Sequence, residues 1–370
     1  MSDNLRRYCD IHAALKRRCG REVKGRFAQH LTTLSHLVSG IVGSKRCSTS
    51  AIASKVPTPQ KRQSRIRRYE RSLANETVTF ATYYAPFLAR LLASLPEGPL
   101  VLIMDGSEVG QEAQALVVSV VYQNRALPLC WQVVTGKKGH VSEETHRALL
   151  QKAAALVPPT RRVVFLGDGE YNGVGLLQAA TDLGWDYVCR IPRNTLISEA
   201  GDESRHSLRE TGLRPGEQVV YEDVTFSGAG FGPVLVVGLW HTRHHAPLYL
   251  VSNCDLPEEA VLYYKQRFRI ETLFSDQKSR GFHLAHSHLR ATDRLEHLLI
   301  ATCLAYVWLV CLGVAVLLAG KLSVVHRTDR CDLSLFQIGL LWLEHCLNKN
   351  KPIPIFLAIP RLMGKAKCVG

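Results

Sequence analysis

The sequence contains no Cys-x-x-Cys pair, although it has eleven cysteines in 370 residues. The cysteines are scattered and odd in number, which excludes a disulfide-stapled secreted scaffold and favours a reducing compartment. The first ten residues, MSDNLRRYCD, carry charges where a secretory signal peptide requires an apolar segment. The sequence therefore predicts a cytoplasmic protein.

Acidic residues are scarce in the first fifth of the chain. Residues 1–71 contain seventeen Lys and Arg but only four Asp and Glu, whereas the remaining residues are nearly neutral. Almost all of the net charge of +14 therefore lies in this segment. Such a concentration of cations predicts a polyanionic partner, because each Lys or Arg placed on a phosphate releases condensed counterions. The alternative is a solvated basic surface without a ligand.

The same segment shows apolar residues at helical spacing within 5–15, 27–38 and 66–73. We therefore expect a small basic helical domain that binds a polyanion such as double-stranded DNA. Nothing in the spacing defines a helix-turn-helix, since that motif depends on its turn geometry. The candidate DNA contacts come from the densest basic cluster, which consists of Lys61, Arg62, Arg65, Arg67 and Arg68.

Downstream, the pattern changes to apolar runs typical of buried strands. After a helix expected around 78–92, three strands are expected at 100–104, 115–122 and 127–135, and their short connections predict an antiparallel meander. Ser142, followed by two acids, predicts the start of a further helix. Strand, helix and strand then alternate between 163 and 191, which predicts parallel pairing. The expected fold class is α/β, a mixed sheet flanked by helices.

The expected domain organisation has four parts. A turn-rich stretch with short strands expected at 218–225, 233–240 and 248–252 separates the α/β units from helices that resume at Glu258. The predicted boundaries are a basic helical DNA-binding domain at 1–95, a split catalytic domain at 96–200 and 256–325, a β-rich insertion at 201–255, and a C-terminal helical segment at 326–370.

Two carboxylates follow apolar strands. Asp105 ends the first expected strand, and Asp168 ends the strand at 163–166. The carboxyl ends of strands are where open α/β sheets place their ligands. Either aspartate alone could simply form a turn.

A third carboxylate lies on a stretch predicted to be one continuous helix, 263–278. On such a helix a sector of about 60° is polar and basic around a single acid, and the opposite side is apolar. The polar face consists of Tyr264, Arg267, Glu271 and Lys278. The apolar face consists of Leu262, Ile270 and Leu273. By spacing alone, an exposed amphipathic helix with an i,i+4 ion pair explains this pattern equally well.

These residues resemble a known family. The spacing Tyr264-x2-Arg267-x3-Glu271-x6-Lys278 is similar to the Y-R-E-K signature of bacterial DDE transposases of the insertion sequence four family. The contexts LIMDGSEVG around Asp105 and LGDGEYNG around Asp168 also resemble that family, as does a β-rich insertion before the third acid. The resemblance spans about 100–312.

The resemblance implies an RNase H-like fold in which Asp105, Asp168 and Glu271 are the catalytic and metal-binding residues. Hard oxygen donors without His or Cys suit Mg²⁺, with Mn²⁺ as a substitute. Two such ions can stabilise the attacking and leaving oxygens of a phosphodiester. The implied activity is cut-and-paste transposition, in which water frees a 3′-hydroxyl at the element end and that hydroxyl attacks target DNA.

The resemblance also implies DNA contacts at the site. Arg267 and Lys278 would hold phosphates beside the scissile bond, and Tyr264 would donate to a phosphate or seat the helix. Trp240 is a candidate for stacking on a flipped base, as is Tyr249, although both also fit a strand core. The implied partners are terminal inverted repeats, target DNA and a second copy of the chain, which would form a homodimer in the synaptic complex.

Other signals point elsewhere. His241, His244, His245 and Cys254 lack a complete zinc-ligand spacing, as do the N-terminal cysteines around His12. Residues 298–320 carry no charge and are long enough to span a bilayer. The small residues that interrupt this apolar segment favour a buried core helix instead, and therefore a protein that does not bind a membrane. Two other functions stay open: a catalytically inactive DNA-binding regulator of transposition, and a membrane-anchored protein with a basic cytosolic arm.

Overall fold

The computed structural model describes residues 1–136, 139–199, 204–327 and 329–360. The chain forms two compact units. One consists of residues 1–96, 108–114 and 273–370, and the other of residues 97–107 and 115–272. The four-part organisation expected from the sequence stays a prediction. Its boundary at 200/201 and its last ten residues lie outside the described residues.

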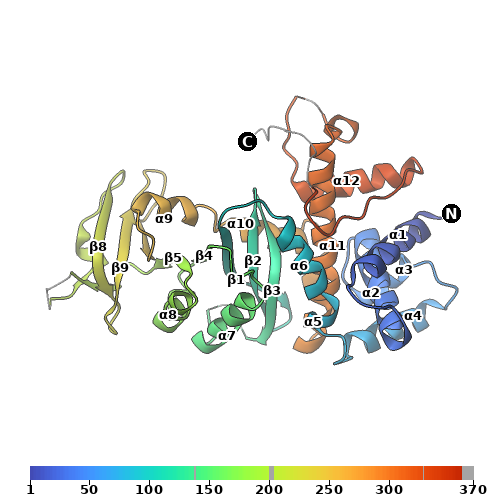
Figure 1. The fold of residues 1–370 in the computed structure, drawn as a ribbon, viewed down its shortest axis with the longest axis horizontal. Coiled ribbons are helices and arrows are strands. Elements are labelled where there is room, and N and C mark those ends of the chain that lie inside the picture. The colour runs from blue at the N-terminus through green and yellow to red at the C-terminus, as the bar shows by residue number, and fades with distance from the viewer. Residues whose placement is uncertain (137–138, 200–203, 328, 361–370) are drawn as a thin grey trace. The chain divides into compact units, whose positions relative to one another are not determined.

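The first unit is helical, with α1 and α2 packed together at the N-terminus (Figure 1). Its N-terminal helices are α1 (Asp3–Arg18), α2 (Gly25–Ser44), α3 (Thr49–Ser54), α4 (Arg62–Leu73), α5 (Phe80–Tyr83) and α6 (Ala85–Ser94). The prediction of a single helix around 78–92 is wrong, because the helix is interrupted at Tyr84 and Pro86 lies in the first turn of α6. Proline lacks the N–H that would continue a helix, and it is tolerated at the start of a new one.

The C-terminal part of this unit contains the longest helix. Its elements are η2 (Leu284–His286), α11 (Thr292–Leu318), η3 (Leu322–Val324) and α12 (Leu335–Asn348). In the described part of the chain, α11 is the one helix long and apolar enough to cross a membrane, but 94% of its most apolar window is buried inside the protein. It packs against α12, α2 and α4. The burial agrees with the core helix that the sequence favoured.

The second unit contains a ten-stranded mixed sheet in the order β3-β2-β1-β4-β5-β10-β9-β8-β6-β7. Its strands are β1 (Leu100–Gly110), β2 (Ala113–Tyr122), β3 (Arg125–Thr135), β4 (Val163–Gly167), β5 (Asp186–Ile191), β6 (Leu196–Ser198), β7 (His206–Ser207), β8 (Gln218–Phe226), β9 (Phe231–Leu239) and β10 (Leu248–Ser252). Its helices are α7 (Glu143–Ala154), α8 (Val174–Asp182), the short η1 (Leu208–Thr211) and α9 (Pro257–Tyr264), while α10 (Arg269–Gln277) continues into the first unit.

The strand pairings confirm the predicted fold class. Two-residue connections join β1 to β2 and β2 to β3, as an antiparallel meander requires. β4 pairs in parallel with both β1 and β5, through the apolar runs that the sequence marks as buried strands. Helices flank this mixed sheet in the manner expected of an RNase H-like domain.

The β-rich insertion extends the same sheet. β10 pairs antiparallel with β5 and with β9, and β8 continues from β9 (Figure 1). The three insertion strands expected at 218–225, 233–240 and 248–252 are therefore present, and the pairing of β10 with β5 joins them to the rest of the sheet.

Candidate active site

The strand register brings the first two predicted carboxylates together. In the parallel pair of β1 and β4, the last partners are Met104 and Gly167. The next residue on each chain is Asp105 or Asp168, and neighbouring strands lie about 4.8 Å apart. The two aspartates therefore stand side by side where β4 ends. β1 itself continues past Asp105 to Gly110, so the prediction that a strand ends at Asp105 is wrong, although its pairing with β4 does end there.

Asp105 is almost fully buried, with 3% of its surface exposed. Its Oδ1 accepts a hydrogen bond of 2.7 Å from the backbone N–H of Gly106. Its Oδ2 lies 3.6 Å from Nη1 of Arg267. A buried carboxylate requires such partners, because an isolated charge in the interior is costly.

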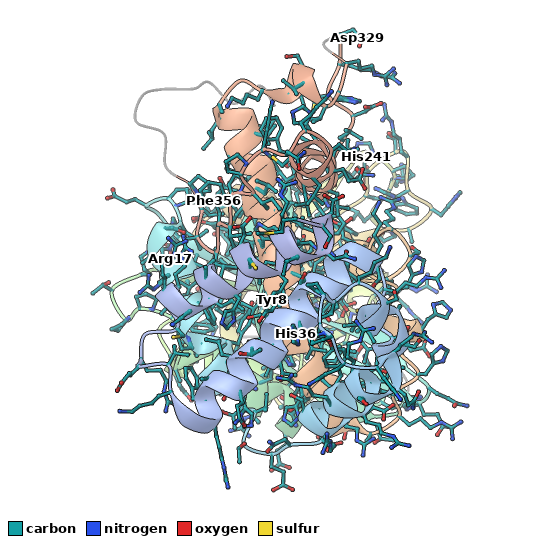
Figure 2. All side chains as sticks on the ribbon, turned by 90° about the vertical axis from the view of Figure 1, so that its right-hand side faces the viewer. Tyr8, Arg17, His36, His241, Asp329 and Phe356 are labelled. Carbon is teal, nitrogen blue, oxygen red and sulfur yellow. The ribbon has the colours of Figure 1, made fainter. Side chains whose placement is uncertain are left out.

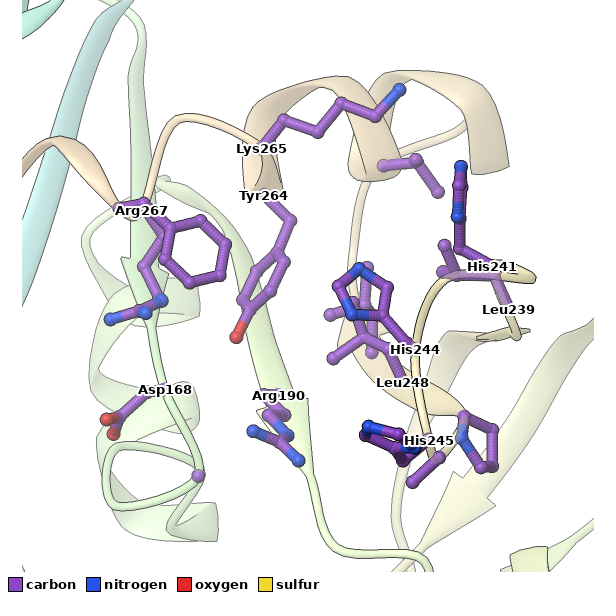
Figure 3. Close-up of a pocket in the computed structure, with 16 residues that line it drawn as sticks. Asp168, Arg190, Leu239, His241, His244, His245, Leu248, Tyr264, Lys265 and Arg267 are labelled. Carbon is purple, nitrogen blue, oxygen red and sulfur yellow. The ribbon is translucent and has the colours of Figure 1, made fainter.

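Arg267 connects Asp105 to the third predicted carboxylate. Its Nη2 donates a hydrogen bond of 3.0 Å to Oε1 of Glu271. The Arg267 side chain is only 8% exposed, whereas that of Glu271 is 58% exposed. The guanidinium also lies over the ring of Phe268, 4.3 Å from its centroid. One arginine therefore bridges a buried and an exposed acid, and Figure 3 shows its guanidinium and Asp168 in the same part of the pocket.

The turn after β4 is built around Asp168. Its Oδ1 accepts from the N–H of Glu170 at 2.9 Å, and its carbonyl accepts from the N–H of Tyr171 at 3.0 Å. Gly167 is required there, because a Cβ at this position would lie 2.6 Å from Cβ of Tyr171 and 3.0 Å from Sγ of Cys189. The short sequence Gly-Asp-Gly-Glu-Tyr therefore folds into a turn that presents Asp168.

Tyr171 lies close enough to both aspartates for their charges to affect its hydroxyl. It is fully buried, and burial together with the negative charges of Glu170, Asp105 and Asp168 raises the pKa of its hydroxyl, while Arg267 lowers it. The ring of His146 lies 4.7 Å from that of Tyr171. Burial lowers the pKa of His146, which opposes the raising effect of Glu143 and Asp168. A neutral Tyr–His pair thus lies next to the carboxylates.

Glu143 fixes the helix that follows the turn. Its Oε1 accepts from the N–H of Leu176 at 2.8 Å, at the start of α8. A Cβ at Gly173 or Gly175 would lie within 2.8 Å of this carboxylate, so both glycines make room for it. A carboxylate at a helix N-terminus is favourable, because the unpaired N–H groups there carry partial positive charge.

The donor set fits a hard divalent cation. Carboxylate oxygens are the ligands that Mg²⁺ and Mn²⁺ prefer, and Asp105, Asp168 and Glu271 supply them. In the described residues, however, no three His, Cys, Asp or Glu side chains are gathered closely enough to hold an ion. Arg267 contacts two of the three carboxylates, and their role as metal ligands stays a prediction.

The continuous helix expected at 263–278 is wrong. α9 ends at Tyr264 and α10 begins at Arg269, and the residues between them form successive i,i+3 hydrogen bonds. This tighter winding rotates the polar residues relative to an α-helix. Leu262, expected on the packed side, is therefore 63% exposed. Arg267, expected on an open polar face, is buried.

Tyr264 is buried at the end of α9, where 4% of it is exposed. Burial raises the pKa of its phenol to about 12, and the positive charges of Arg267 and Arg190 partly oppose this. Its hydroxyl is therefore a donor at neutral pH. In Figure 3 the hydroxyl points into the pocket between Arg267 and Arg190.

Three predicted DNA contacts remain, namely Lys278, Trp240 and Tyr249. Lys278 follows α10 in the other compact unit, so its role at the site stays a prediction. The indole N–H of Trp240 donates to the carbonyl of His244 at 2.9 Å and so closes the loop after β9. Tyr249 is a buried strand residue whose hydroxyl pairs with Thr211 at 2.9 Å. Base stacking by Trp240 stays a prediction.

A pocket of about 470 Å³ opens beside Asp168 and Arg267. Its floor is apolar, and cationic or potentially cationic side chains surround it (Figure 3). These are Arg190, Lys265, His241, His244 and His245. Sequence reasoning missed Arg190 and Lys265. The one available signal for Arg190 was a single cation inside the mostly apolar strand DYVCRI.

The basic N-terminal helices form a second candidate surface. Two grooves flank α4, of about 610 Å³ and 590 Å³. Hydrogen-bonding side chains line them, mainly Arg68, Arg71, Gln29, His30 and Asn75 on one side and Arg67, Arg71 and Arg294 on the other.

The predicted basic contacts around α4 divide into two groups. Lys61, Arg62 and Arg67 are exposed. Arg65 donates to the carbonyl of Val56 and Arg68 to the hydroxyl of Thr33, so these two also anchor the helix.

Comparison with known proteins identifies the class. Residues 96–308 match the transposase DDE domain family, and because this match covers more than half of the chain, the chain belongs to that family. It is thus a transposase-type enzyme of DNA transposition. The match does not extend to the narrower insertion sequence four family or its signature, which stay predictions. None of the curated proteins compared with the chain matches it.

The chain is also similar to solved structures. The piggyBac transposase synaptic complex with hairpin DNA has 10% sequence identity and a TM-score of 0.47, with 98% of this chain and 84% of that chain covered. Human endonuclease V has 17% identity and a TM-score of 0.26, with 60% and 96% covered. These similarities are too weak to assign a function.

Proposed function

We propose that the protein binds the terminal inverted repeats of its own insertion sequence and catalyses metal-dependent DNA cleavage and strand transfer. Cut-and-paste transposition is the overall reaction. The basic helices of residues 1–95 bind the repeats, and the mixed-sheet domain carries out the chemistry on both donor and target DNA. Two copies pair the element ends as a homodimer in the nucleoid-associated cytoplasm.

The register of β1 and β4 carries this proposal. It makes Asp105 and Asp168 neighbours at the point where the pairing of β1 and β4 ends, within a transposase DDE domain. Arg267 then connects Glu271 to the same place. These three carboxylates, linked by the strand pairing and by Arg267 in a family of this chemistry, are the candidates for its catalytic acids.

Asp105, Asp168 and Glu271 would hold Mg²⁺, or Mn²⁺ in its place. When bound, such an ion would polarise a phosphodiester and lower the pKa of water. The protein's own residues bind and orient the DNA. Arg267 and Lys278 neutralise phosphates beside the scissile bond, and Tyr264 donates its hydroxyl proton in a hydrogen bond to a phosphate oxygen. Trp240, whose chain neighbours Leu239 and His241 line the pocket, stacks on a displaced base.

Cleavage of a plasmid that carries the gene's native flanking DNA tests the catalytic part. We expect cutting at the element boundaries with Mg²⁺ or Mn²⁺ and none with EDTA. Asp105→Asn and Glu271→Gln should lower the rate at least about 100-fold, because each removes a charged ligand. Binding to the ends should survive in both variants.

Glu258→Gln is the matched control, since Glu258 is an exposed acid in the first turn of α9. It should cut at the wild-type rate. A folded wild-type protein that binds the ends but never cuts them would replace the enzyme with the second candidate, a catalytically inactive regulator of transposition. Equal loss in the control variant would show that the three carboxylates have no special role.

A further inference from the structure

Arg267 makes contacts that a metal ion would also make. Its two terminal nitrogens lie 3.6 Å from Oδ2 of Asp105 and 3.0 Å from Oε1 of Glu271. These are two of the three acids proposed to hold a divalent cation. A guanidinium and a divalent cation repel each other, and both require the same carboxylate oxygens. When Arg267 pairs with these carboxylates, binding of a divalent cation to them is therefore disfavoured, and the reverse also holds.

The contacts of Arg267 are incomplete enough to be exchanged. The distance to Asp105 exceeds that of a good hydrogen bond. Its Nε is buried without a hydrogen-bond partner among the described residues. Its other neighbour, Glu271, is largely exposed, as is Phe268, on whose ring the guanidinium lies.

The structure also provides a place for the guanidinium to move. The pocket of about 470 Å³ begins at Arg267 and Phe268 and continues to Arg190 and Lys265 (Figure 3). A DNA phosphate attracted by these cations would offer Arg267 two oxygens in the paired geometry that a guanidinium prefers. The exchange would replace carboxylates with a phosphate as the partner of Arg267.

We propose that Arg267 is an internal counter-ion that holds Asp105 and Glu271 in the metal-free protein and yields them to the divalent cation when DNA phosphate captures its guanidinium. Arg267 thereby couples metal binding to DNA binding and acts as a positioning residue. This inference rests on the proposed function, since it takes the carboxylates as metal ligands and DNA as the substrate. It adds that the two ligands bind cooperatively.

Binding of Mn²⁺ to the full chain without DNA, followed by electron paramagnetic resonance, tests the competition. Arg267→Gln should bind Mn²⁺ at least about tenfold more tightly than the wild type, because it removes a positive charge next to the ligand oxygens. Lys265→Gln is the matched control. It removes a cation from the same pocket, one whose charge makes no ion pair with these carboxylates in the described structure, and it should change the affinity less than about twofold.

A second variant guards against misfolding. Arg267→Lys keeps one charge but cannot bridge two carboxylates, so its Mn²⁺ affinity should lie between those of the wild type and Arg267→Gln. Circular dichroism identifies folded preparations. If folded Arg267→Gln or Arg267→Lys binds Mn²⁺ no more tightly than the wild type, the competition does not exist and the inference is overturned.

The coupling is measured through DNA affinity. Fluorescence anisotropy of a labelled duplex carrying the gene's flanking end should show that Mn²⁺ strengthens wild-type binding more than it strengthens binding by Arg267→Gln. Linkage requires this reciprocity, and non-specific effects of Mn²⁺ on DNA are common to both proteins. An equal effect of Mn²⁺ on both proteins contradicts the inference even where the plasmid is cut and the proposed function holds. A chain that shows both predicted differences but cuts no plasmid contradicts the proposed function alone.

Discussion

At the scale of single residues, His36 shows how the basic unit responds to acid. It lies in α2 with 3% of its surface exposed, and its ring centroid is 4.7 Å from that of Tyr8 (Figure 2). Its Nδ1 has no hydrogen-bond partner among the described residues. Burial, followed by the positive charges of Arg68, His12 and Arg65, lowers its pKa to about 3. The folded protein therefore holds His36 neutral.

Acid should destabilise the protein through this residue. The unfolded chain takes up a proton on His36 near pH 6.5, and the folded chain does so only near pH 3, so stability is lost as the pH falls between these values. Between pH 7 and pH 5 this corresponds to about 2 kcal/mol. Urea unfolding at pH 7 and pH 5 should show that His36→Gln loses about 2 kcal/mol less free energy of unfolding than the wild type does.

The exposed His286 provides the control, since His286→Gln should leave the wild-type pH dependence unchanged. An identical loss of stability in His36→Gln and the wild type would mean that His36 is not held neutral by folding.

The sequence indicated the candidate acids but not their contacts. Asp105 and Asp168 stand out because each follows an apolar run typical of a buried strand. The position of Arg267 between Asp105 and Glu271 was not predictable, because it depends on where the chain between α9 and α10 tightens. A helical projection extends α-helical geometry through that point and places Arg267 on an open face. Arg190 was missed because strand position alone does not show which pocket a side chain lines.

At the scale of elements, α11 and α12 pack with their backbones in close contact. A Cβ at Gly313 would lie 1.9 Å from the carbonyl oxygen of Leu335, and one at Gly339 would lie 2.0 Å from that of Leu309. Ser334 and Gln337 form a capping box that fixes where α12 begins. Small residues at both crossing points therefore allow two apolar helices to approach without side chains between them.

Adding one methyl group should separate these helices. Gly313→Ala should lower the free energy of unfolding by about 1–3 kcal/mol, because the backbone of α12 must shift to accommodate it. Thermal and urea unfolding measure the change. Gly228→Ala is the control, since a Cβ there meets no atom within 4 Å. Equal stability of Gly313→Ala and the wild type would contradict the close packing.

Regular elements were predicted from the sequence more accurately than their interruptions. The cap at Ser142 and the two acids after it correctly place the start of α7. The breaks at Tyr84 and between α9 and α10 were missed, because both lie inside stretches whose apolar spacing is helical throughout. The first interruption coincides with the proline at position 86, and the second with the tertiary contacts of Arg267. Apolar periodicity predicts neither.

At the scale of the whole molecule, the charge is divided unevenly. Residues 1–71 carry nearly all of the net charge of +14. Not all of these cations are available to a ligand. Arg7 is 4% exposed and donates to the carbonyl of Ser39 at 2.9 Å, and burial lowers its pKa to about 10. The proposed DNA binding therefore depends on the exposed part of this charge, which includes Arg67 and Arg71 on α4.

The salt dependence of DNA affinity should report how many of these cations contact phosphates. Arg67→Gln and Arg71→Gln should each weaken binding to the gene's flanking DNA and reduce the slope of log affinity against log salt by about one. Lys349→Gln, an exposed cation beyond the end of α12, should leave the slope unchanged. Fluorescence anisotropy over a range of salt concentrations gives the slopes. Unchanged slopes in both α4 variants would show that DNA binds elsewhere.

The sequence also predicted the strands of the insertion, but not that they extend the catalytic sheet. Pairing of β10 with β5 joins residues more than fifty positions apart, and a strand pattern contains no information about its partner.

The burial of α11 also affects how the chain is synthesised. This helix is apolar on nearly all sides, and α12, which covers it closely at Gly313, lies further along the chain. During translation α11 therefore leaves the ribosome before its covering helix exists. In that interval α11 can pack only against helices that precede it, such as α2 and α4, so the nascent chain exposes the apolar face of α11 that α12 later covers. Chaperones and membrane-targeting factors compete to bind surfaces of this kind.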